Sequence, residues 1–155
     1  MPAILRLKGD GFTPFSMVLE RLADRAGDAR PAFDKMADVF AASMRHQFDK
    51  AGGHTGPRWA PLTPQYAAQK QRTHPGAPLM VRDGGLRGDL TSRPLAVEHI
   101  TSKRMIVGTS RDYARYHQDG TGAMVARKLI GTPTAQERKR YASILHEHII
   151  EGANA

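Results

Sequence analysis

The chain has 155 residues, which predicts a single domain, and it contains no cysteine, which excludes disulfides, thiolate metal sites and thiol nucleophiles. Lysine and arginine number 23 against 15 aspartates and glutamates, and the formal net charge of +8 favours polyanions or acidic protein surfaces as partners. No apolar run approaches the ~20 residues of a membrane helix, and charges interrupt the first ten residues where a signal peptide would be apolar, so we expect no membrane contact.

Two helices are predicted in the N-terminal third, after an N-terminal arm at residues 1–12. Thr13 and Pro14 have the cap-plus-proline pattern of a helix start, and this helix is expected to end near Gly27. A second helix is expected over 31–49, because apolar residues recur along it at helical spacing: Phe33, Met36, Ala37, Phe40, Met44 and Phe48. Such a stripe is typical of a buried face, so this helix must pack on a sheet or on partner helices.

The middle of the chain alternates breaks with short helices. Residues 51–58 contain three glycines and a proline, which predicts a loop. Thr63 and the proline after it repeat the cap-plus-proline pattern, which predicts a short helix over 64–71 that the prolines at 74–78 end. After a glycine turn, one or two helical turns are predicted over 86–90, because two leucines there share a helix face.

The last third changes character, because β-favouring residues replace the helical pattern. Residues 95–108 predict a hairpin that turns at 102–103, and 113–118 predict a short helical segment. A third strand is predicted over 124–130, and a last helix is predicted to begin at 132–134.

The order of these elements is helices, then strands, then a helix, which predicts an α+β fold. We expect long N-terminal helices packed on a small antiparallel β-sheet, with a C-terminal helix. We expect one domain over 1–155, in which residues 13–150 form the body and 151–155 form a frayed tail.

The sequence offers no constellation typical of catalysis or metal binding. His146 and His148 are two positions apart on a predicted helix, so their rings would point about 200° apart and could not share an ion. The serines lack a nucleophile elbow, and the glycine pairs lack the context that cradles phosphate. We therefore expect neither an enzyme nor a bound cofactor or metal.

The remaining charged residues have simple interpretations. Six early aspartates, from Asp10 to Asp49, are expected on polar helix faces as solubilising charge. The segment 111–116 interleaves two arginines with two tyrosines, as a nucleic-acid groove would. The two tyrosines are also spaced to share one helix face, so packing explains them equally well.

Short motifs carry a resemblance along residues 33–150. They are Gly56, Trp59, Pro61 and Leu62 with Tyr66 and Lys70; Leu79, Val81, Gly85, Leu86 and Thr91; Val107, Gly108 and Thr109; Tyr113, Ala114, Tyr116, His117, Gln118 and Gly120; and Ala126, Arg127, Leu129, Ile130 and Gly131. This ordered set resembles the phage virion morphogenesis family, which comprises tail completion and neck proteins of tailed bacteriophages, including Mu-like phages.

The resemblance implies a structural virion protein and not an enzyme. It implies a small subunit that forms a ring, expected to be a hexamer, in the neck at the head–tail junction, as a tail completion or tail terminator protein. The implied partners are copies of itself, other neck and head-completion proteins, the tail-tube protein and, in passing, genomic DNA. The implied location is the virion neck or tail, and the host cytoplasm during assembly. Positive charge lining a DNA channel would hold DNA back, so we expect most of it to face elsewhere. From the charge alone, the alternative is a basic nucleic-acid-binding domain.

A ring subunit needs aromatic or arginine anchors at its contacts, and this expectation selects eight candidate interface residues. The candidates are Trp59, Tyr66, Tyr113, Tyr116, His117, Gln118, Arg127 and Lys128. Trp59 is either a loop anchor or a cap on its own core. The residues of 113–118 fix a sheet edge or a subunit contact, or His117 and Gln118 form internal hydrogen bonds. Arg127 and Lys128 face an acidic neighbour or DNA, or are simply solvated.

Overall fold

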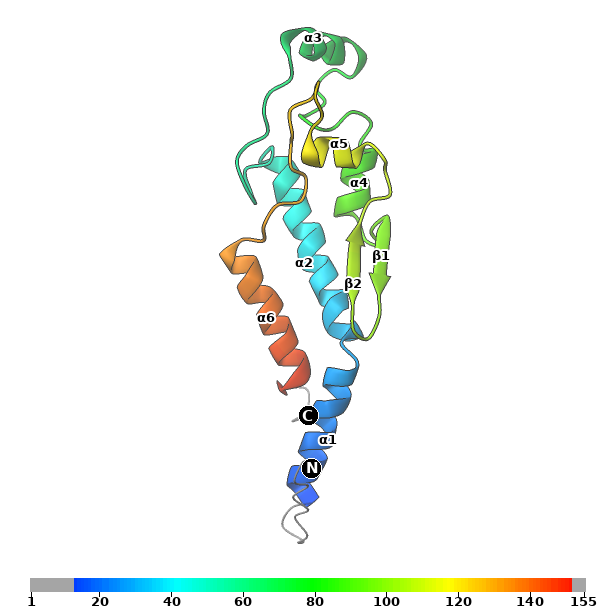
Figure 1. Ribbon diagram of the computed structural model, residues 1–155, viewed down its shortest axis with the longest axis vertical. Coiled ribbons are helices and arrows are strands. Elements are labelled where there is room, and N and C mark those ends of the chain that lie inside the picture. Colours follow the sequence, from blue (N-terminus) through cyan, green and yellow to red (C-terminus); the bar gives the residue numbers. More distant parts are fainter. Residues whose placement is uncertain (1–12, 152–155) are drawn as a thin grey trace.

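The computed structural model describes residues 13–151, with side chains from residue 17 onward (Figure 1). The predicted arm at 1–12 and the part of the predicted tail after residue 151 lie outside the described residues. Within them, six helices accompany one two-stranded antiparallel sheet, so the predicted α+β class is confirmed and the fold is mostly helical. The elements are α1 (Thr13–Gly27), α2 (Arg30–Asp49), α3 (Pro64–Thr73), α4 (Gly85–Thr91), β1 (Val97–Ile100), β2 (Met105–Gly108), α5 (Ala114–Asp119) and α6 (Ala135–Ile149).

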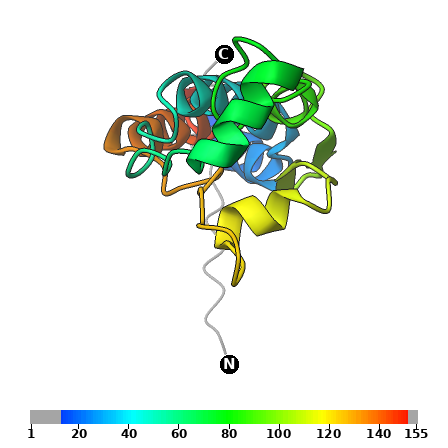
Figure 2. The ribbon, with the colours of Figure 1, turned by 90° about the horizontal axis from the view of Figure 1, so that it is seen from above.

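The long helix α2 is the centre of an elongated molecule. In Figure 1, α6 lies along one side of α2 and the hairpin along the other, with α1 below and α3 above. Seen from above, α5 and the loop after it project away from the helices (Figure 2). Between residues 13 and 151, no helix combines the length and apolarity needed to cross a membrane.

The lower half of the molecule has a core made by helices and the hairpin. Ala32 and Met36 of α2 and Ile144 of α6 are buried in it, and Ile144 is 1% exposed. Half-buried apolar side chains complete this lower core: Phe33, Val39, Met105, Tyr141 and Leu145. The stripe predicted on α2 is thus a core face, and α6 supplies the partner helix.

The upper half has a second core, to which loops contribute. Met44 and Phe48, from the other end of the α2 stripe, pack here with Leu86, Leu90 and Ala114 of α4 and α5. Two further members come from irregular segments, Trp59 after α2 and Leu129 before α6. This upper core therefore holds together segments that are far apart in the sequence.

The chain leaves α2 through a turn that only glycine fits. Gly52 has a φ of +90°, and a Cβ on it would approach Cδ1 of the Trp59 indole to 2.5 Å. The main-chain N–H of Trp59 donates to the carbonyl of Ala51 at 2.7 Å, which brings the loop back over the end of the helix. The predicted loop over 51–58 is confirmed.

The last helix begins with a capping box at Thr134, inside the range 132–134 where the sequence predicts the start of a helix. The N–H of Glu137 donates to Oγ1 of Thr134 at 3.2 Å, and the N–H of Thr134 donates to Oε2 of Glu137 at 2.7 Å. Two otherwise unpaired amide groups of the first turn are satisfied in this way.

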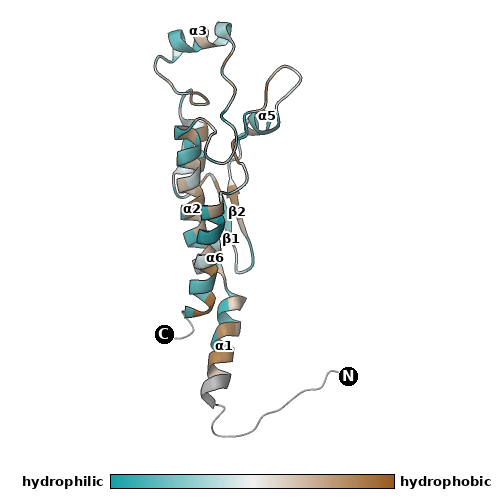
Figure 3. Cartoon of the chain, turned by 90° about the vertical axis from the view of Figure 1, so that its left-hand side faces the viewer, coloured by the Kyte–Doolittle hydropathy of each residue, from teal (hydrophilic) through white to brown (hydrophobic). Residues whose placement is uncertain are grey.

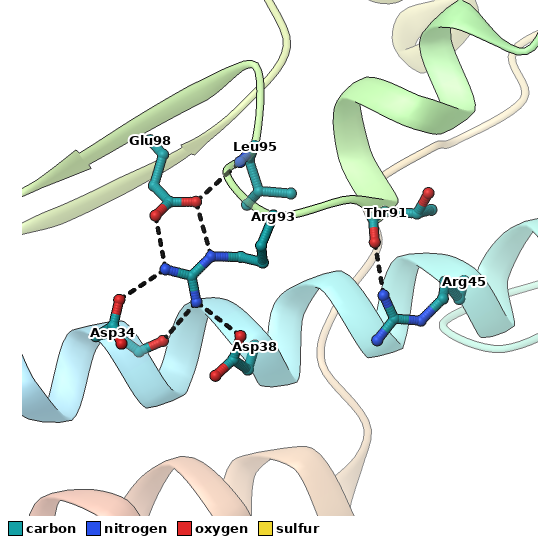
Figure 4. Close-up of polar contacts among 7 residues, drawn as sticks. All are labelled: Asp34, Asp38, Arg45, Thr91, Arg93, Leu95 and Glu98. Atoms are coloured by element: carbon teal, nitrogen blue, oxygen red, sulfur yellow. Dashed lines mark hydrogen bonds and ion pairs between the residues drawn. The ribbon is translucent and has the colours of Figure 1, made fainter.

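The hairpin is attached to α2 by Arg93. Its guanidinium forms a two-point ion pair with Glu98 at 2.6 and 2.9 Å and also reaches Asp34 at 2.7 Å and Asp38 at 2.8 Å (Figure 4). The strands pair from Val97 opposite Gly108 to Ile100 opposite Met105, so the predicted hairpin and its turn are confirmed. The expectation that Asp34 and Asp38 only solubilise the helix is corrected, because both also bind this arginine.

The third strand predicted over 124–130 is absent from the described fold. Only an isolated bridge joins Thr121 to Met124, and the chain then runs as an irregular loop to α6. Gly120 explains the bend: its φ is +77°, and a Cβ there would lie 2.9 Å from the Met124 carbonyl oxygen. Since the loop folds back on α5, its amide groups find partners there and not in a sheet.

Candidate interaction site

The eight candidate residues divide into a buried group and an exposed group. Trp59 and Arg127 are 6% and 8% exposed, and His117 and Gln118 are half-buried. The three tyrosines and Lys128 are exposed: Tyr66 by 45%, Tyr113 by 40% and Tyr116 by 41%. In the first group, the side chains of Trp59, Gln118 and Arg127 bind the protein's own backbone, and the second group faces outward.

Trp59 lies in the upper core. Its ring packs edge-on against Phe48, with the ring centroids 5.5 Å apart. Its Nε1–H donates to the main-chain carbonyl of Lys128 at 2.7 Å, and Nε2 of Gln47 donates to the same oxygen at 3.2 Å. Of the two interpretations of Trp59, the structure has the second, in which the ring caps its own core. Its hydrogen bond to Lys128 involves the main-chain carbonyl and not the lysine side chain.

Arg127 is a link between two loops. Its Nε donates to the carbonyl of Ala60 at 2.7 Å, and Nη2 donates to that of Pro61 at 2.8 Å. Its main-chain N–H donates to the carbonyl of His117 at 2.7 Å. Arg127 therefore joins the segment before α3 to the loop after α5, with its guanidinium turned into the protein.

Gln118 has an internal role. Its Oε1 accepts from the N–H groups of Leu129 and Ile130 at 2.9 and 3.0 Å, and its Nε2 donates to the carbonyl of Ile130 at 2.7 Å. His117 stands edge-on to Tyr113, and its Nδ1 is a buried atom without a hydrogen-bond partner among the described residues. Burial and the charge of Arg127 lower the pKa of His117, so its ring is neutral at pH 7.

Two of the exposed tyrosines border a cleft of about 710 Å³. Tyr66 comes from α3, whose first turn Thr63 caps, and Tyr113 precedes α5. Val125, which is 64% exposed, lines the cleft from the loop after α5. Tyr116 lies outside the cleft, where Arg115 stacks over its ring at 4.9 Å. We call this hollow, between α3, the segment 80–87 and residues 111–127, the α3–α5 cleft.

Five cationic side chains and one carboxylate, Asp83, line the α3–α5 cleft; the cations are Lys70, Arg82, Arg87, Arg111 and Arg127. Arg87 pairs with Asp49 and Arg111 with Asp89, each at 2.7 Å. Sequence reasoning did not bring these five cations together, because they come from three separated segments of the chain. The one available signal was the placement of Lys70 one helical turn after Tyr66.

A second exposed apolar surface lies at the opposite end of the molecule. Met17 and Leu19 of α1 are each 49% exposed, and Ile150, just after α6, is 42% exposed. Figure 3 shows the apolar colour along α1, and α5 projecting to the side at the other end. Met17 and Leu19 are two positions apart on α1 and therefore lie on opposite sides of the helix. We call the exposed apolar side chains at this end, Met17, Leu19 and Ile150, the α1 surface.

The histidines near the end of the chain are separated, as predicted. Nε2 of His148 donates to the carbonyl of Asp28 at 2.8 Å, which ties α6 to the end of α1, while the side chain of His146 is 63% exposed. Over the described range 13–151, no three histidine or acidic side chains gather in a way that could hold a metal ion.

Comparison with known proteins agrees with the motifs. A model of the phage virion morphogenesis family matches residues 10–149, and the chain belongs to this family. It is also similar to the Mu-like prophage FluMu G protein 1 of Haemophilus influenzae, with 29% identity over 106 residues, which cover 67% of this chain and 68% of the relative. No solved structure matches it. The chain therefore has a structural role in the bacteriophage virion, and the family is a structural one.

Proposed function

We propose that this chain is a tail completion protein of the terminator type, which forms a ring in the neck where head and tail join. Its membership of the phage virion morphogenesis family and its likeness to a Mu-like prophage protein support this role. The ring is expected to be a hexamer, located in the virion and built from subunits made in the host cytoplasm.

The observation that carries the ring is the presence of exposed apolar side chains at two different places on one subunit. One is the α1 surface, and the other is formed by Tyr113 and Tyr116 beside α5. They lie near opposite ends of the long axis (Figure 1). A head-to-tail interface joins two unlike patches, and it closes into a ring when the rotation between neighbours closes.

The partners above and below the ring would be other neck and head-completion proteins and the tail-tube protein. Genomic DNA would pass through without being held. The buried guanidinium of Arg127 already binds two carbonyl oxygens, so it would contribute little to a channel lining. Lys128, Arg138 and Arg140 are exposed, and a ring in which all of them point into the channel would contradict this part of the proposal.

Light scattering after size exclusion, together with electron microscopy, tests the ring. The wild-type chain of 17.0 kDa should elute with about six times that mass. Leu19→Lys on α1 and Tyr116→Lys on α5 should each give monomers. An equimolar mixture of the two variants should give dimers, because one intact surface of each kind remains. Ile106→Lys on β2, which alters an equally exposed apolar residue outside both surfaces, should leave the ring intact.

Two results would oppose the proposal. One is a strict monomer at high concentration combined with normal head–tail joining in particles that lack the protein. The other is a mixture of the two variants that stays monomeric, which would show that the surfaces do not meet head to tail.

The second candidate is a basic nucleic-acid-binding domain. The net charge of +8 and the stacking of Arg115 on the exposed ring of Tyr116 favour it. A DNA affinity that falls steeply with salt, in a protein absent from virus particles, would select this candidate.

A further inference from the structure

We propose that the α3–α5 cleft binds an acidic segment of an adjoining virion protein that carries a large apolar side chain. This inference rests on the proposed function and names the chemistry of one partner. Its argument uses the two buried cations of the cleft, the charge of its lining and its apolar surface.

The first observation is a pair of buried cations without a carboxylate partner. Lys70 and Arg127 are 9% and 8% exposed, and neither takes part in any of the ion pairs within residues 13–151. Their hydrogen bonds go to main-chain carbonyls: Lys70 donates to Pro78, and Arg127 to Ala60 and Pro61. Buried charges in proteins are normally paired, so a carboxylate entering the cleft would supply what these cations lack.

The second observation is the charge of the whole lining. Arg82 adds a third cation that has no ion pair in the described part of the chain. The lining stays net positive even when Asp83 and the two carboxylates that pair with Arg87 and Arg111 are counted. Asp83 is occupied as well, because its Oδ1 accepts from the N–H of Gly85 at 3.0 Å. The cleft therefore attracts an anionic ligand.

The third observation is the apolar surface between the cations. Leu62, Met80 and Leu86 line the cleft, and Val125 and the ring of Tyr66 are exposed beside them. A DNA backbone offers phosphates but no apolar group to fill such a space, whereas a protein segment offers both. Because this chain itself has a net charge of +8, a partner richer in carboxylates than a second copy fits better.

Calorimetric titration of the full chain with synthetic probes tests the proposal. The first probe is the capped acidic peptide Glu-Asp-Leu-Phe-Glu-Asp, and the others are Glu-Asp-Gly-Ser-Glu-Asp, Lys-Lys-Leu-Phe-Lys-Lys and a short DNA duplex. The first probe should bind with a Kd at least about tenfold lower than each of the others, since it alone combines both kinds of group.

Two variants locate the binding. Arg82→Gln removes an exposed cation, and Val125→Asp places a carboxylate at an exposed apolar position, so neither disturbs a buried contact. Each should raise the Kd of the first probe by about tenfold. Lys139→Gln, an equal loss of charge on α6 outside the cleft, should leave the Kd unchanged.

The inference is overturned if the first probe does not bind, if the glycine-serine probe or the DNA duplex binds equally well, or if Val125→Asp has no effect. Failure of the cleft proposal can be told apart from failure of the proposed function, because the proposed function is tested by light scattering and particle imaging. Rings without peptide binding would remove only the cleft proposal. Peptide binding by a protein that is absent from particles would remove only the virion ring.

Discussion

The two ends of α2 are stabilised in different ways. Around Met36 and Ile144, every apolar side chain of the core comes from a helix or the hairpin, and Arg93 and His148 add polar contacts between these regular elements. Around Phe48, the core includes Trp59 and Leu129 from irregular loops. Those loops are held by side chains that bind main-chain groups. The core of the lower half is thus built from regular elements alone, whereas the core of the upper half also needs hydrogen bonds that hold irregular loops in place.

The largest expected effect on stability is at Trp59, because its side chain both packs in the upper core and donates a hydrogen bond to a loop. Trp59→Ala should lower the free energy of unfolding by about 3–5 kcal/mol, since it leaves a cavity beside Phe48 and removes the shorter of the two hydrogen bonds to the carbonyl of Lys128. Trp59→Phe keeps much of the packing and should cost about 1–3 kcal/mol. Urea denaturation measures both. A loss below 1 kcal/mol for Trp59→Ala would show that the loops do not depend on this residue.

The next effect concerns Glu137, which joins α6 to the loop after α2. Burial raises the pKa of this carboxyl, but hydrogen bonds from Ser43, His54 and Thr134 outweigh burial and lower the pKa to about 2. Since this pKa lies below the ordinary value of 4.5, the ionised Glu137 carboxylate stabilises the folded state fully above about pH 4.5. This stabilisation is lost as the pH falls toward 2. At neutral pH this stabilisation is on the order of 3 kcal/mol.

The test compares the wild type with Glu137→Gln across this pH range by thermal or urea unfolding. The difference in stability should be greatest at neutral pH and should shrink below pH 4.5. Glu20→Gln, which changes an exposed carboxyl on α1, should show no such trend. A difference that stays constant down to pH 2.5 would mean that ionisation of Glu137 is not what stabilises this junction.

A smaller effect is expected at Gln118, whose side chain holds the loop after α5. Gln118→Leu removes three hydrogen bonds to Leu129 and Ile130 and should cost about 1–3 kcal/mol. Gln118→Glu keeps the acceptor oxygens and should retain part of this stability. Hydrogen exchange of the two amides should accelerate more in the leucine variant than in the glutamate variant. Equal exchange in both would show that another group orders the loop.

The smallest effect on stability is expected at Tyr116, which lies outside both cores. Its exposed side chain contacts Arg115, so Tyr116→Ala should change the free energy of unfolding by less than about 0.5 kcal/mol. If the ring interface includes this residue, the same variant should weaken assembly, which light scattering at several concentrations would detect. A large loss of stability would instead place Tyr116 among the structural residues of the upper half.

Sequence reasoning succeeded where structure depends on periodicity and caps. The stripe on α2, the start signals at Thr63 and Thr134 and the alternation in the hairpin each predicted an element that the structure contains. It failed over 124–130, where apolar residues suggested a strand. There the amide groups bind Gln118 and the carbonyl of His117, which are distant partners that no local pattern specifies.

The candidate site was predictable only in part, for the same reason. The tyrosines of 113–118 stood out because they alternate with arginines and belong to a motif of the family. The α3–α5 cleft was not visible in the sequence, because its lining comes from residues 61–70, 80–87 and 111–127. The inward direction of Arg127 was equally hidden, since it depends on carbonyl groups that only the folded loop before α3 presents.

Finally, α2 has a mechanical consequence. Its 20 residues extend over about 30 Å and carry no glycine or proline beyond the first turn, so the helix contains none of the usual points of bending. Since side chains of this one rod are embedded in both cores, a push or a twist applied near α1 reaches the far end as a rigid displacement. We therefore expect the two halves of the subunit to keep a fixed position relative to each other.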